Sequence, residues 1–499
     1  MYQDDKIYMG LADGQRVTMQ LNMSNRHGLI AGASGTGKTI TMKVMAESFS
    51  DAGVPVFLCD VKGDVSGLAM PGEFSDSMED RIEKFGLDEC FDYKAYPVSF
   101  WDVYQEKGHP VRVTVSDMGP DLLSKIMGLT PAQEGVLDIV FRIADDRGLM
   151  LIDLKDLRAV LNYVSEHRKE YLTEYGNIAP QSVGGIVRAL IPLEEQGGDL
   201  FFGEPALDIF DWIRTESRGR GVVNILDCVK LSQNPTLYAS FLLWLMAELF
   251  ERLPEAGDLE RPKLVFFFDE AHLLFDDAPK VLVQKIEQMV KLIRSKGVGI
   301  YFVTQSPSDI PDSVLAQLSN RVQHALRAYT PAEQKAVRTA AQTFRPNPVF
   351  KTEDVIMELG VGEALTSFLD EKGIPGIAQR TAIICPQSYM GPVDESVRAK
   401  FIRHDNMDKY DDYVDNISAY EVLNEQAKRD AEQARLDAER AQLEKEKAEL
   451  EKKKQKEKEA EEKKRERAAE RRKAQIERSL INTGGQVLKR GLFKTLFKK

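Results

Sequence analysis

The octapeptide GASGTGKT, Gly32–Thr39, matches the phosphate-loop pattern GxxxxGK[ST] at every fixed position. An apolar, strand-like run, Gly28–Ala31, precedes it, and a helical pattern, Ile40–Phe49, follows it. Glycines at this point let the backbone curl so that successive N–H groups face a phosphate chain, and the following helix adds its positive N-terminal end. The alternative is a chance glycine-rich turn, but the flanking strand and helix favour a nucleotide site.

Two side chains of this loop have expected roles of their own. We expect Lys38 to reach the β- and γ-phosphates as a point charge, and the Thr39 hydroxyl to ligate Mg²⁺. The expected cofactors are therefore ATP and Mg²⁺. The residues expected to bind the nucleotide are Gly32, Ala33, Ser34, Gly35, Thr36, Gly37, Lys38, Thr39 and Ile40.

The second half of the same site is expected at LVFFFDEAH, Leu264–His272. Five apolar residues predict a buried strand that ends in two acids, Asp269 and Glu270, where parallel sheets place their ligands. We expect Asp269 to hold the Mg²⁺ shell through water, and Glu270 to orient and polarise the attacking water. Alternatively, an acid here caps the helix that AHLLF would begin, a role that is compatible with catalysis.

Further polar residues follow other expected strands. Gln305, after Ile300–Val303, could hydrogen-bond the γ-phosphate or the water, or only satisfy a loop carbonyl. Asp60 ends the run Val54–Cys59 on the same side and is expected to partner the Mg²⁺ or a water. Phosphoryl transfer also gains from a cation on the developing charge, often an arginine from a neighbouring subunit. The candidates, each of which could instead be a solvated surface group, are Arg294, Arg321 and Arg26.

The overall composition excludes several classes of protein. The 499 residues are 43% hydrophobic and 29% charged, as in soluble globular proteins, and a net charge of −12 argues against a uniformly basic nucleic-acid coat. Four scattered cysteines do not build a disulfide framework, and no apolar run approaches the ~18 residues of a membrane span. The opening MYQDDKIYMG lacks the basic-then-apolar pattern of a secretion signal. A reducing, cytoplasmic setting is expected.

Strand-like and helix-like runs alternate along the first part of the chain, which predicts an α/β fold with a mainly parallel sheet covered on both faces. A mostly helical insert over 100–215 interrupts this rhythm. We expect two halves of one core, 1–99 and 216–400, then a linker and charged helix, 401–480, and a basic amphipathic tail, 481–499. The expected strands are Gly28–Ala31, Val54–Cys59, Gly221–Leu226, Leu264–Phe268, Gly299–Thr304 and Thr381–Cys385.

The C-terminal region differs from the rest of the chain in its charge. Residues 421–480 carry 19 basic and 17 acidic side chains, residues 481–499 carry 5 basic and no acidic ones, and residues 1–420 have a net charge of −19. This composition predicts a helix, either a short coiled coil or a solvated helix with i,i+4 ion pairs. The segment 486–499 could lie on anionic lipid, nucleic acid or a protein groove, or be a frayed terminus. The leucines spaced by seven, before Glu457 ends the register, are Leu436, Leu443 and Leu450.

Six motifs occur in a fixed order along residues 1–400: GASGTGKT, DVKGD, FFFDEAH, IRSKGVG, VTQSPSDIPDSVLAQLSNRVQHAL and LGVGEAL. Together they resemble the HerA/FtsK superfamily of hexameric DNA-pumping P-loop ATPases, most closely its bacterial HerA-like, YjgR-type branch. The resemblance implies a RecA-like core, a ring, and ATP hydrolysis between subunits. It also implies that Arg294 acts on the neighbouring subunit's nucleotide, that Arg26 is a second functional arginine, and that Gln305 is the strand-end sensor.

Two features depart from this family pattern. A short hairpin around Ile7–Met19 is expected where HerA proper carries a β-barrel, so a nuclease partner bound through such a barrel is not expected. The charged C-terminal helix is an addition.

The resulting hypothesis is a Mg²⁺-dependent ATPase, hexameric as the resemblance implies, that moves along or remodels DNA. Because residues 1–420 are acidic overall, basic residues that meet DNA would have to be confined to the lumen. Lys62 and Lys296 are candidates for this role, or else ordinary loop lysines. Two alternatives stay open: an ATP-switched scaffold whose C-terminal helix recruits a protein partner, and a membrane-peripheral ATPase anchored through 486–499.

Overall fold

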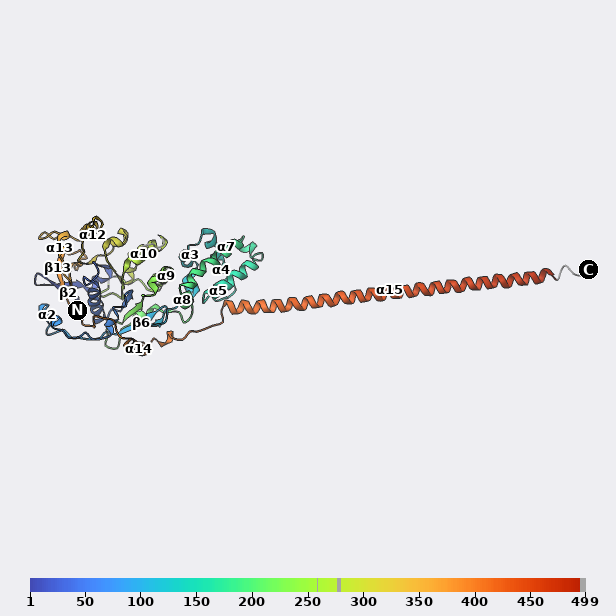
Figure 1. Ribbon diagram of the computed structural model, residues 1–499, viewed down its shortest axis with the longest axis horizontal. Helices are drawn as coiled ribbons and strands as arrows, with labels where there is room; N and C mark the ends of the chain where they lie inside the picture. Colours follow the sequence, from blue (N-terminus) through green and yellow to red (C-terminus); the bar gives the residue numbers. More distant parts are fainter. Residues whose placement is uncertain (258, 276–279, 494–499) are drawn as a thin grey trace, which may run out of the picture. The chain divides into compact units, whose positions relative to one another are not determined.

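A sheet of 13 strands organises the chain, and the computed structural model describes it within residues 1–257, 259–275 and 280–493 (Figure 1). Two compact units, Met1–Val422 and Leu423–Lys499, make up the chain. The strands are β1 (Tyr2–Gln3), β2 (Lys6–Ala12), β3 (Gln15–Gln20), β4 (Gly28–Ala31), β5 (Val56–Asp60), β6 (Val98–Asp102), β7 (His109–Pro110), β8 (Val223–Asp227), β9 (Leu264–Phe268), β10 (Val298–Thr304), β11 (Asn320–His324), β12 (Glu363–Ser367) and β13 (Gln379–Ile383).

The strand order is β1-β2-β13-β12-β11-β4-β10-β9-β5-β8-β6-β7, with β3 paired to β2. From β11 to β7 every neighbouring pair is parallel, which confirms the expected α/β fold with a mainly parallel sheet. From β1 to β11 the pairs are antiparallel. The strand expected at Thr381–Cys385 therefore lies in an antiparallel wing. Residues 368–378, which join it to β12, contain no helix, and a parallel crossover needs about a dozen residues or more.

Helices cover both faces of the parallel part of the sheet. Along the part of the chain that the structure describes, the helices are, in order, α1 (Lys38–Asp51), α2 (Asp76–Lys84), α3 (Val115–Ile126), α4 (Pro131–Asp146), α5 (Leu154–Glu166), α6 (Leu172–Tyr175), α7 (Pro180–Glu195), α8 (Gly198–Phe201), α9 (Pro235–Arg252), α10 (Lys280–Leu292), α11 (Asp312–Leu315), α12 (Pro331–Gln342), α13 (Thr352–Glu358), α14 (Glu395–His404) and α15 (Ala419–Phe493). Helices α3–α8 all fall between β7 and β8, so the helical part of the insert begins at Val115, after two strands that belong to the sheet.

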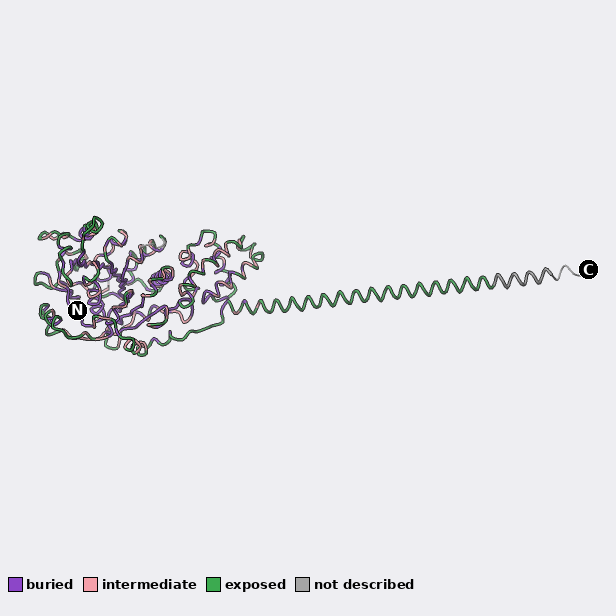
Figure 2. The backbone as a smooth tube through the Cα atoms, in the orientation of Figure 1, coloured by how far each residue is buried: buried purple, intermediate pink, exposed green. Residues whose placement is uncertain are grey.

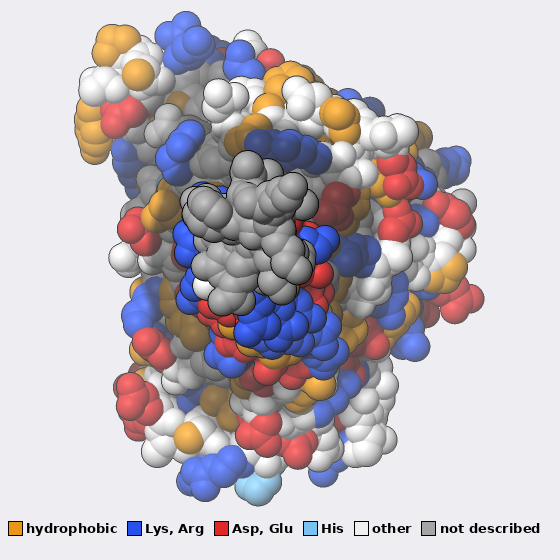
Figure 3. Space-filling view, turned by 90° about the vertical axis from the view of Figure 1, so that its right-hand side faces the viewer, with side chains coloured by type: hydrophobic (Ala, Val, Ile, Leu, Met, Phe, Trp, Pro, Cys, Tyr) orange, Lys and Arg blue, Asp and Glu red, His pale blue; other side chains and the backbone are white. Residues whose placement is uncertain are grey.

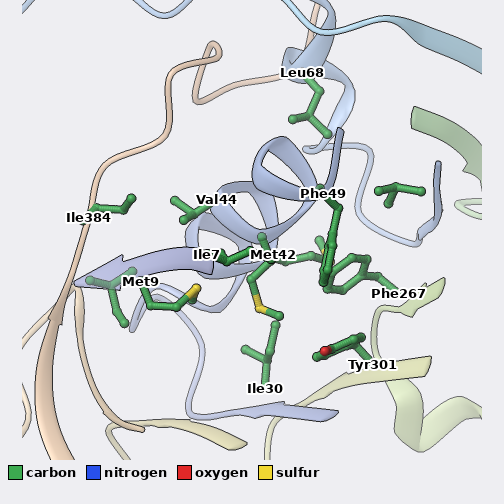
Figure 4. Packing of buried hydrophobic residues seen from close by; sticks show 14 of the residues in the cluster. Ile7, Met9, Ile30, Met42, Val44, Phe49, Leu68, Phe267, Tyr301 and Ile384 are labelled. Atoms are coloured by element: carbon green, nitrogen blue, oxygen red, sulfur yellow. The ribbon is translucent and has the colours of Figure 1, made fainter. Parts of the chain in front are cut away.

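The core follows from the alternation of side chains along each strand. Figure 4 shows Met42 and Phe49 of α1 packed among Phe267 of β9 and Tyr301 of β10, on one face of the sheet. Successive side chains along a strand point to opposite faces of the sheet. On the other face, Phe57 of β5 packs near Phe241 of α9, with ring centroids 6.5 Å apart. Both faces are thus buried, as a parallel sheet requires. This packing fixes α1, and with it the loop that precedes α1.

Helix α15 is continuous over Ala419–Phe493, and its described side chains are almost all exposed (Figure 2). Ion pairs link Arg429 to Glu425 and Arg435 to Glu439, at 3.0 and 3.7 Å, with the i,i+4 spacing of a solvated helix. The coiled coil stays a prediction, and part of the expected basic tail, residues 494–499, lies outside the described residues. In the part of the chain that the structure describes, no helix is long and apolar enough to cross a membrane.

The segment before α15 is fastened to the end of the sheet at His109. This histidine is fully buried, with Nδ1 2.6 Å from Asp411 Oδ1 and Nε2 2.8 Å from Asp405 Oδ1. Nearby, Arg112 donates a hydrogen bond to the carbonyl of Tyr410 at 2.8 Å. Residues 405–411, expected to be part of a linker, therefore fold back onto β7.

This arrangement predicts a pH-dependent stability. Burial lowers the pKa of His109, but the two carboxylates outweigh it and raise the pKa above the ordinary 6.5. The charged network therefore stabilises fully below pH 6.5 and weakens as the pH rises through the raised pKa of the folded state. We expect His109→Gln to lower the melting temperature more at about pH 6 than at about pH 8.5. His404→Gln, at an exposed residue of α14, serves as control. An equal loss at both pH values would contradict a charged His109.

Candidate nucleotide-binding site

The phosphate loop has the backbone conformation that its glycines permit. Gly32, Gly35 and Gly37 have φ values of 153°, 76° and 116°, which residues with a side chain rarely adopt. A Cβ atom on Gly32 would lie 2.5 Å from the Cβ of His324 in β11, so the loop packs directly against that strand. Ser34 and Gly35 form the exposed tip of the loop. The N–H groups of Gly32 and Ala33 donate to the carbonyls of Thr304 and Ala325, at 3.2 and 2.9 Å, which anchors the loop to the sheet. An anion would bind at the N–H groups that follow, at the start of α1.

His324 of β11 packs against the phosphate loop. Its Nε2 lies 2.8 Å from Thr41 Oγ1 in α1, and its Nδ1 lies 2.9 Å from the carbonyl of Glu363 at the start of β12. Burial lowers the pKa of His324 to about 4, so the ring is neutral at physiological pH. Sequence reasoning missed this residue, because the motif alone does not show which strand lies beneath the loop.

Lys38 folds back over its own loop. Its Nζ donates to the carbonyls of Gly32 at 2.6 Å and Ala33 at 3.3 Å, and the residue is 5% exposed. Burial, followed by the charge of Lys62, lowers the pKa of Lys38, whereas the charges of Glu270 and other acids raise it. The lysine therefore shares one electrostatic environment with the acidic pair, although the two motifs are far apart in sequence.

The acidic pair follows β9 directly. Asp269 and Glu270 are 3% and 5% exposed, and Asp269 Oδ1 accepts a hydrogen bond from the Glu270 N–H at 2.9 Å. Glu270 has a left-handed backbone, with φ 46° and ψ 51°, a conformation that costs a non-glycine residue about 1–3 kcal/mol. This turn lets two consecutive acids serve one site. Burial raises the pKa of Asp269 to about 6.

The carboxylate of Glu270 forms an ion pair with a lysine. Lys62 Nζ lies 2.5 Å from Glu270 Oε1, and His272 Nδ1 lies 3.2 Å from Oε2. Burial alone would raise the pKa of Glu270, but the hydrogen bond and charge of Lys62, the charge of His272 and a hydrogen bond with Gln305 lower it on balance. Gln305 thus lies beside Glu270, at the end of β10. Lys62, considered above as a lumen lysine, forms an ion pair with Glu270 in this structure, and a place in a lumen stays a prediction.

Asp60 organises the turn that carries Lys62. Its carboxylate accepts hydrogen bonds from the backbone N–H groups of Gly63, Asp64 and Val65, at 2.7, 3.2 and 3.3 Å. Burial, with the charge of Asp64, raises the pKa of Asp60 to about 7. The carboxylate that meets the phosphate loop is that of Asp64, whose Oδ2 accepts from Thr39 Oγ1 at 3.4 Å. Sequence reasoning missed Asp64, the second acid of DVKGD.

The residues at this edge fit a Mg²⁺ ion that is shared with a nucleotide. The buried atoms Asp64 Oδ1 and Asp269 Oδ2 have no hydrogen-bond partner, and the Thr39 hydroxyl lies beside Asp64. Within the described ranges, no group of three or more His, Cys, Asp or Glu residues could hold a metal on its own. Mg²⁺ commonly takes one or two carboxylates and completes its shell with phosphates and water, which Asp64, Asp269 and the Thr39 hydroxyl would allow.

Two candidate arginines lie at the amino-terminal ends of the parallel strands, opposite to the ends that carry the phosphate loop and the acidic pair. Arg294, in the short helix Ile293–Lys296, precedes β10, and Arg26, which ends Leu21–Arg26, precedes β4. Burial, and to a smaller extent the charge of Arg294, lowers the pKa of His27, the residue after Arg26, to about 4. Because β10 has seven residues at ~3.3 Å each, roughly 20 Å separates these ends from Gln305.

The remaining candidates have structural partners. The guanidinium of Arg321 donates to the carbonyls of Leu318, Leu315 and Thr343, and burial lowers its pKa. Lys296 is 9% exposed, and its Nζ lies 3.3 Å from Glu255.

The family model described as "Helicase HerA-like C-terminal" matches residues 6–499. Plasmid coupling protein TrwB, in complex with the non-hydrolysable GTP analogue GDPNP, superposes with a TM-score of 0.53 at 13% identity, over 78% of this chain and 92% of TrwB. The unbound TrwBΔN70 coupling protein gives 0.50 at 14% identity, over 78% and 91%.

VirB4 of Thermoanaerobacter pseudethanolicus gives a TM-score of 0.49 at 15% identity, over 77% of this chain and 97% of VirB4. No curated protein matches the chain. The likeness to TrwB shows the fold, which is that of a RecA-like P-loop ATPase. Given the phosphate loop, the acidic pair beside it and a family match over nearly the whole length, the chain belongs to the Helicase HerA-like C-terminal family.

Proposed function

We propose that this protein is a Mg²⁺-dependent ATPase of the HerA-like motor type. The observation that carries the proposal is the meeting of Lys38, Thr39, Asp269 and Glu270 at one edge of the sheet. A phosphate loop alone supports only nucleotide binding. The buried acidic pair adds a carboxylate that can orient water, so the site has what hydrolysis requires.

The residues would divide the work as follows. The loop N–H groups and Lys38 bind the β- and γ-phosphates, and Thr39 with Asp64 and Asp269 would hold Mg²⁺. When bound, Mg²⁺ neutralises charge on these phosphates. Glu270 orients the attacking water and takes up its proton at Oε1 or Oε2, and Gln305 hydrogen-bonds Glu270 from the end of β10. Asp60 positions the turn rather than binding the ion directly.

The site is completed by a neighbouring subunit. Arg294 and Arg26 lie at the far edge of the sheet, roughly 20 Å from the γ-phosphate side of their own site. Neither arginine can reach that site without crossing the sheet. In a closed ring, one subunit's far edge faces the next subunit's nucleotide, which supports the expected hexamer with Arg294 acting in trans.

DNA is the substrate that we propose for the motor. The support is the family itself, whose description names a helicase. On the face drawn in Figure 3, basic and acidic side chains are intermixed among the described residues. A general attraction to DNA is therefore not built into that face, and contacts with phosphates would have to lie elsewhere, as in a lumen.

A second candidate is an ATP-switched scaffold that uses α15 to recruit a protein. Leu436, Leu443 and Leu450 are spaced by seven on α15 and are 40%, 55% and 55% exposed, so they are available to a partner helix. The membrane-peripheral alternative rests on 486–499, part of which lies outside the described residues.

ATP turnover with and without DNA separates these functions. We expect duplex or single-stranded DNA to stimulate turnover several-fold, and the stimulation to fall steeply with salt because released counterions drive binding. Stimulation by neither DNA would favour the scaffold. Flotation with anionic vesicles that is lost on deleting 486–499 would favour the membrane alternative.

Two substitutions test the chemistry of the site. We expect Lys38→Ala to abolish nucleotide binding, and Glu270→Gln to retain binding while turnover falls by about 10²–10⁴-fold, the usual contribution of a positioned acid or base. Binding is measured by calorimetry with ATP·Mg²⁺, and turnover by phosphate release. Glu371→Gln, an exposed residue between β12 and β13, is the control. Unchanged turnover in Glu270→Gln would remove this residue as the water-positioning acid.

Mixed oligomers test whether Arg294 acts in trans. Arg294→Ala alone should lower turnover by about 10³–10⁵-fold, as loss of an arginine finger does. Mixing it with Glu270→Gln should restore part of the activity, because some interfaces then combine an intact Glu270 with an intact Arg294. A mixture of Lys38→Ala with Glu270→Gln is the matched control, since both lesions lie in the same half-site and no interface is intact. Recovery in neither mixture would show that Arg294 acts in cis.

A further inference from the structure

Lys62 forms a short ion pair at the candidate site, and its partner is the residue that would orient the attacking water. Its Nζ lies 2.5 Å from Glu270 Oε1, while the Glu270 side chain is 6% exposed and that of Lys62 is 41% exposed. His272 approaches the other carboxylate oxygen at 3.2 Å. Among the described residues, Oε2 has no hydrogen-bond partner, so the ion pair with Lys62 is what occupies this carboxylate, and an oxygen bound to an ammonium is poorly placed to accept a proton from water.

The pair lies where the end of a triphosphate would arrive. Lys62 and Lys38 are close enough for their positive charges to repel each other, and Lys38 belongs to the phosphate loop. Asp64, on the same turn as Lys62, contacts Thr39 at the start of α1. A γ-phosphate bound by Lys38 and the loop would thus bring a second anion close to Lys62, in competition with Glu270.

Lys62 can exchange one anion for another because the backbone turn that carries it is fixed, whereas its ammonium lies at the end of a flexible side chain. Three backbone hydrogen bonds to Asp60 fix the turn. The lysine side chain itself is flexible and half-exposed, and its ammonium can exchange one anion for another without movement of the backbone.

We propose that Lys62 is a second phosphate-binding lysine, which holds Glu270 before nucleotide binds and transfers to the γ-phosphate of a nucleoside triphosphate when it arrives. The transfer frees Glu270 to orient water only when a γ-phosphate is present. Lys62 then also places a positive charge on the phosphoryl group that is transferred. The proposal rests on the proposed ATPase function, but it makes a claim about binding alone: Lys62 distinguishes triphosphates from diphosphates.

Lys62→Met, which keeps the length of the side chain and removes its charge, tests this claim in the full-length protein. The measured quantities are the Kd values for ADPNP·Mg²⁺ and for ADP·Mg²⁺, determined by calorimetry. We expect the affinity for ADPNP to fall about 10- to 100-fold, the usual effect of losing a hydrogen bond to a charged group, and the affinity for ADP to stay within about twofold. Lys62→Arg should retain part of the preference for the triphosphate.

Lys230→Met is the matched control. Lys230 also lies in a loop after a parallel strand and pairs with an acid, Glu106, but it follows β8 rather than β5. It should leave both affinities unchanged. Equal changes in the ADPNP and ADP affinities of Lys62→Met, or no change in either, would overturn the proposal. A loss of DNA affinity with unchanged ADPNP affinity would also overturn it, and would return Lys62 to the lumen.

A double-mutant cycle gives a second test that does not depend on one variant. In Glu270→Gln, Lys62 no longer has to leave a carboxylate, so ADPNP should bind more tightly than to the wild type. Adding Lys62→Met should remove most of that gain, which measures the coupling of the two residues. A double variant that binds ADPNP as tightly as Glu270→Gln would contradict the transfer. Because these are affinities, a wild type that binds but does not turn over ATP would overturn the proposed function and leave this inference standing.

Discussion

The parallel register of β4, β10, β9 and β5 is the constraint on which the site depends. Ala31 pairs with Thr304, and Phe268 pairs with both Phe302 and Cys59, so the carboxyl ends of these strands lie within two residues of one another. The residues that follow, among them the phosphate loop and Asp269, are therefore delivered to one edge. The large apolar side chains between this sheet and its helices hold that register, because a slip of one residue would move every side chain of a strand to the opposite face and disrupt the packing on both faces.

The carboxyl ends of these strands bring several buried charged groups together, and pairing between opposite charges compensates them. Buried carboxylates and buried ammonium groups are each unfavourable alone. At this edge Lys62 compensates Glu270, and the loop carbonyls and nearby acids compensate Lys38. Atoms such as Asp269 Oδ2 remain without a partner. The site is thus stable without nucleotide, but it retains unsatisfied groups that a triphosphate and its cation would satisfy.

Much of this arrangement could be predicted from local sequence. GASGTGKT between an apolar run and a helical pattern specified the loop, and β4 and β9 have the expected bounds because their apolar runs end at glycine and at acids. The roles of individual side chains in the site remain predictions.

Other features depend on contacts between distant segments and could not be predicted. His324 of β11 contacts α1 beside the phosphate loop, and Lys62, after β5, pairs with Glu270, after β9. Both contacts join residues that are far apart in sequence. The left-handed backbone of Glu270 was also not predicted. The return of residues 405–411 to His109 likewise has no local signal, because a single histidine does not indicate its partners.

In this site, one bound triphosphate with its Mg²⁺ would contact all of these separated groups at once. A structure of the Glu270→Gln protein with ATP and Mg²⁺ tests it most directly. We expect a γ-phosphate within hydrogen-bonding distance of Lys38 and Lys62, Mg²⁺ beside Thr39, and Arg294 of an adjacent subunit facing the same phosphate. A nucleotide bound elsewhere, or bound here with Lys38 still folded onto the carbonyl of Gly32, would contradict it.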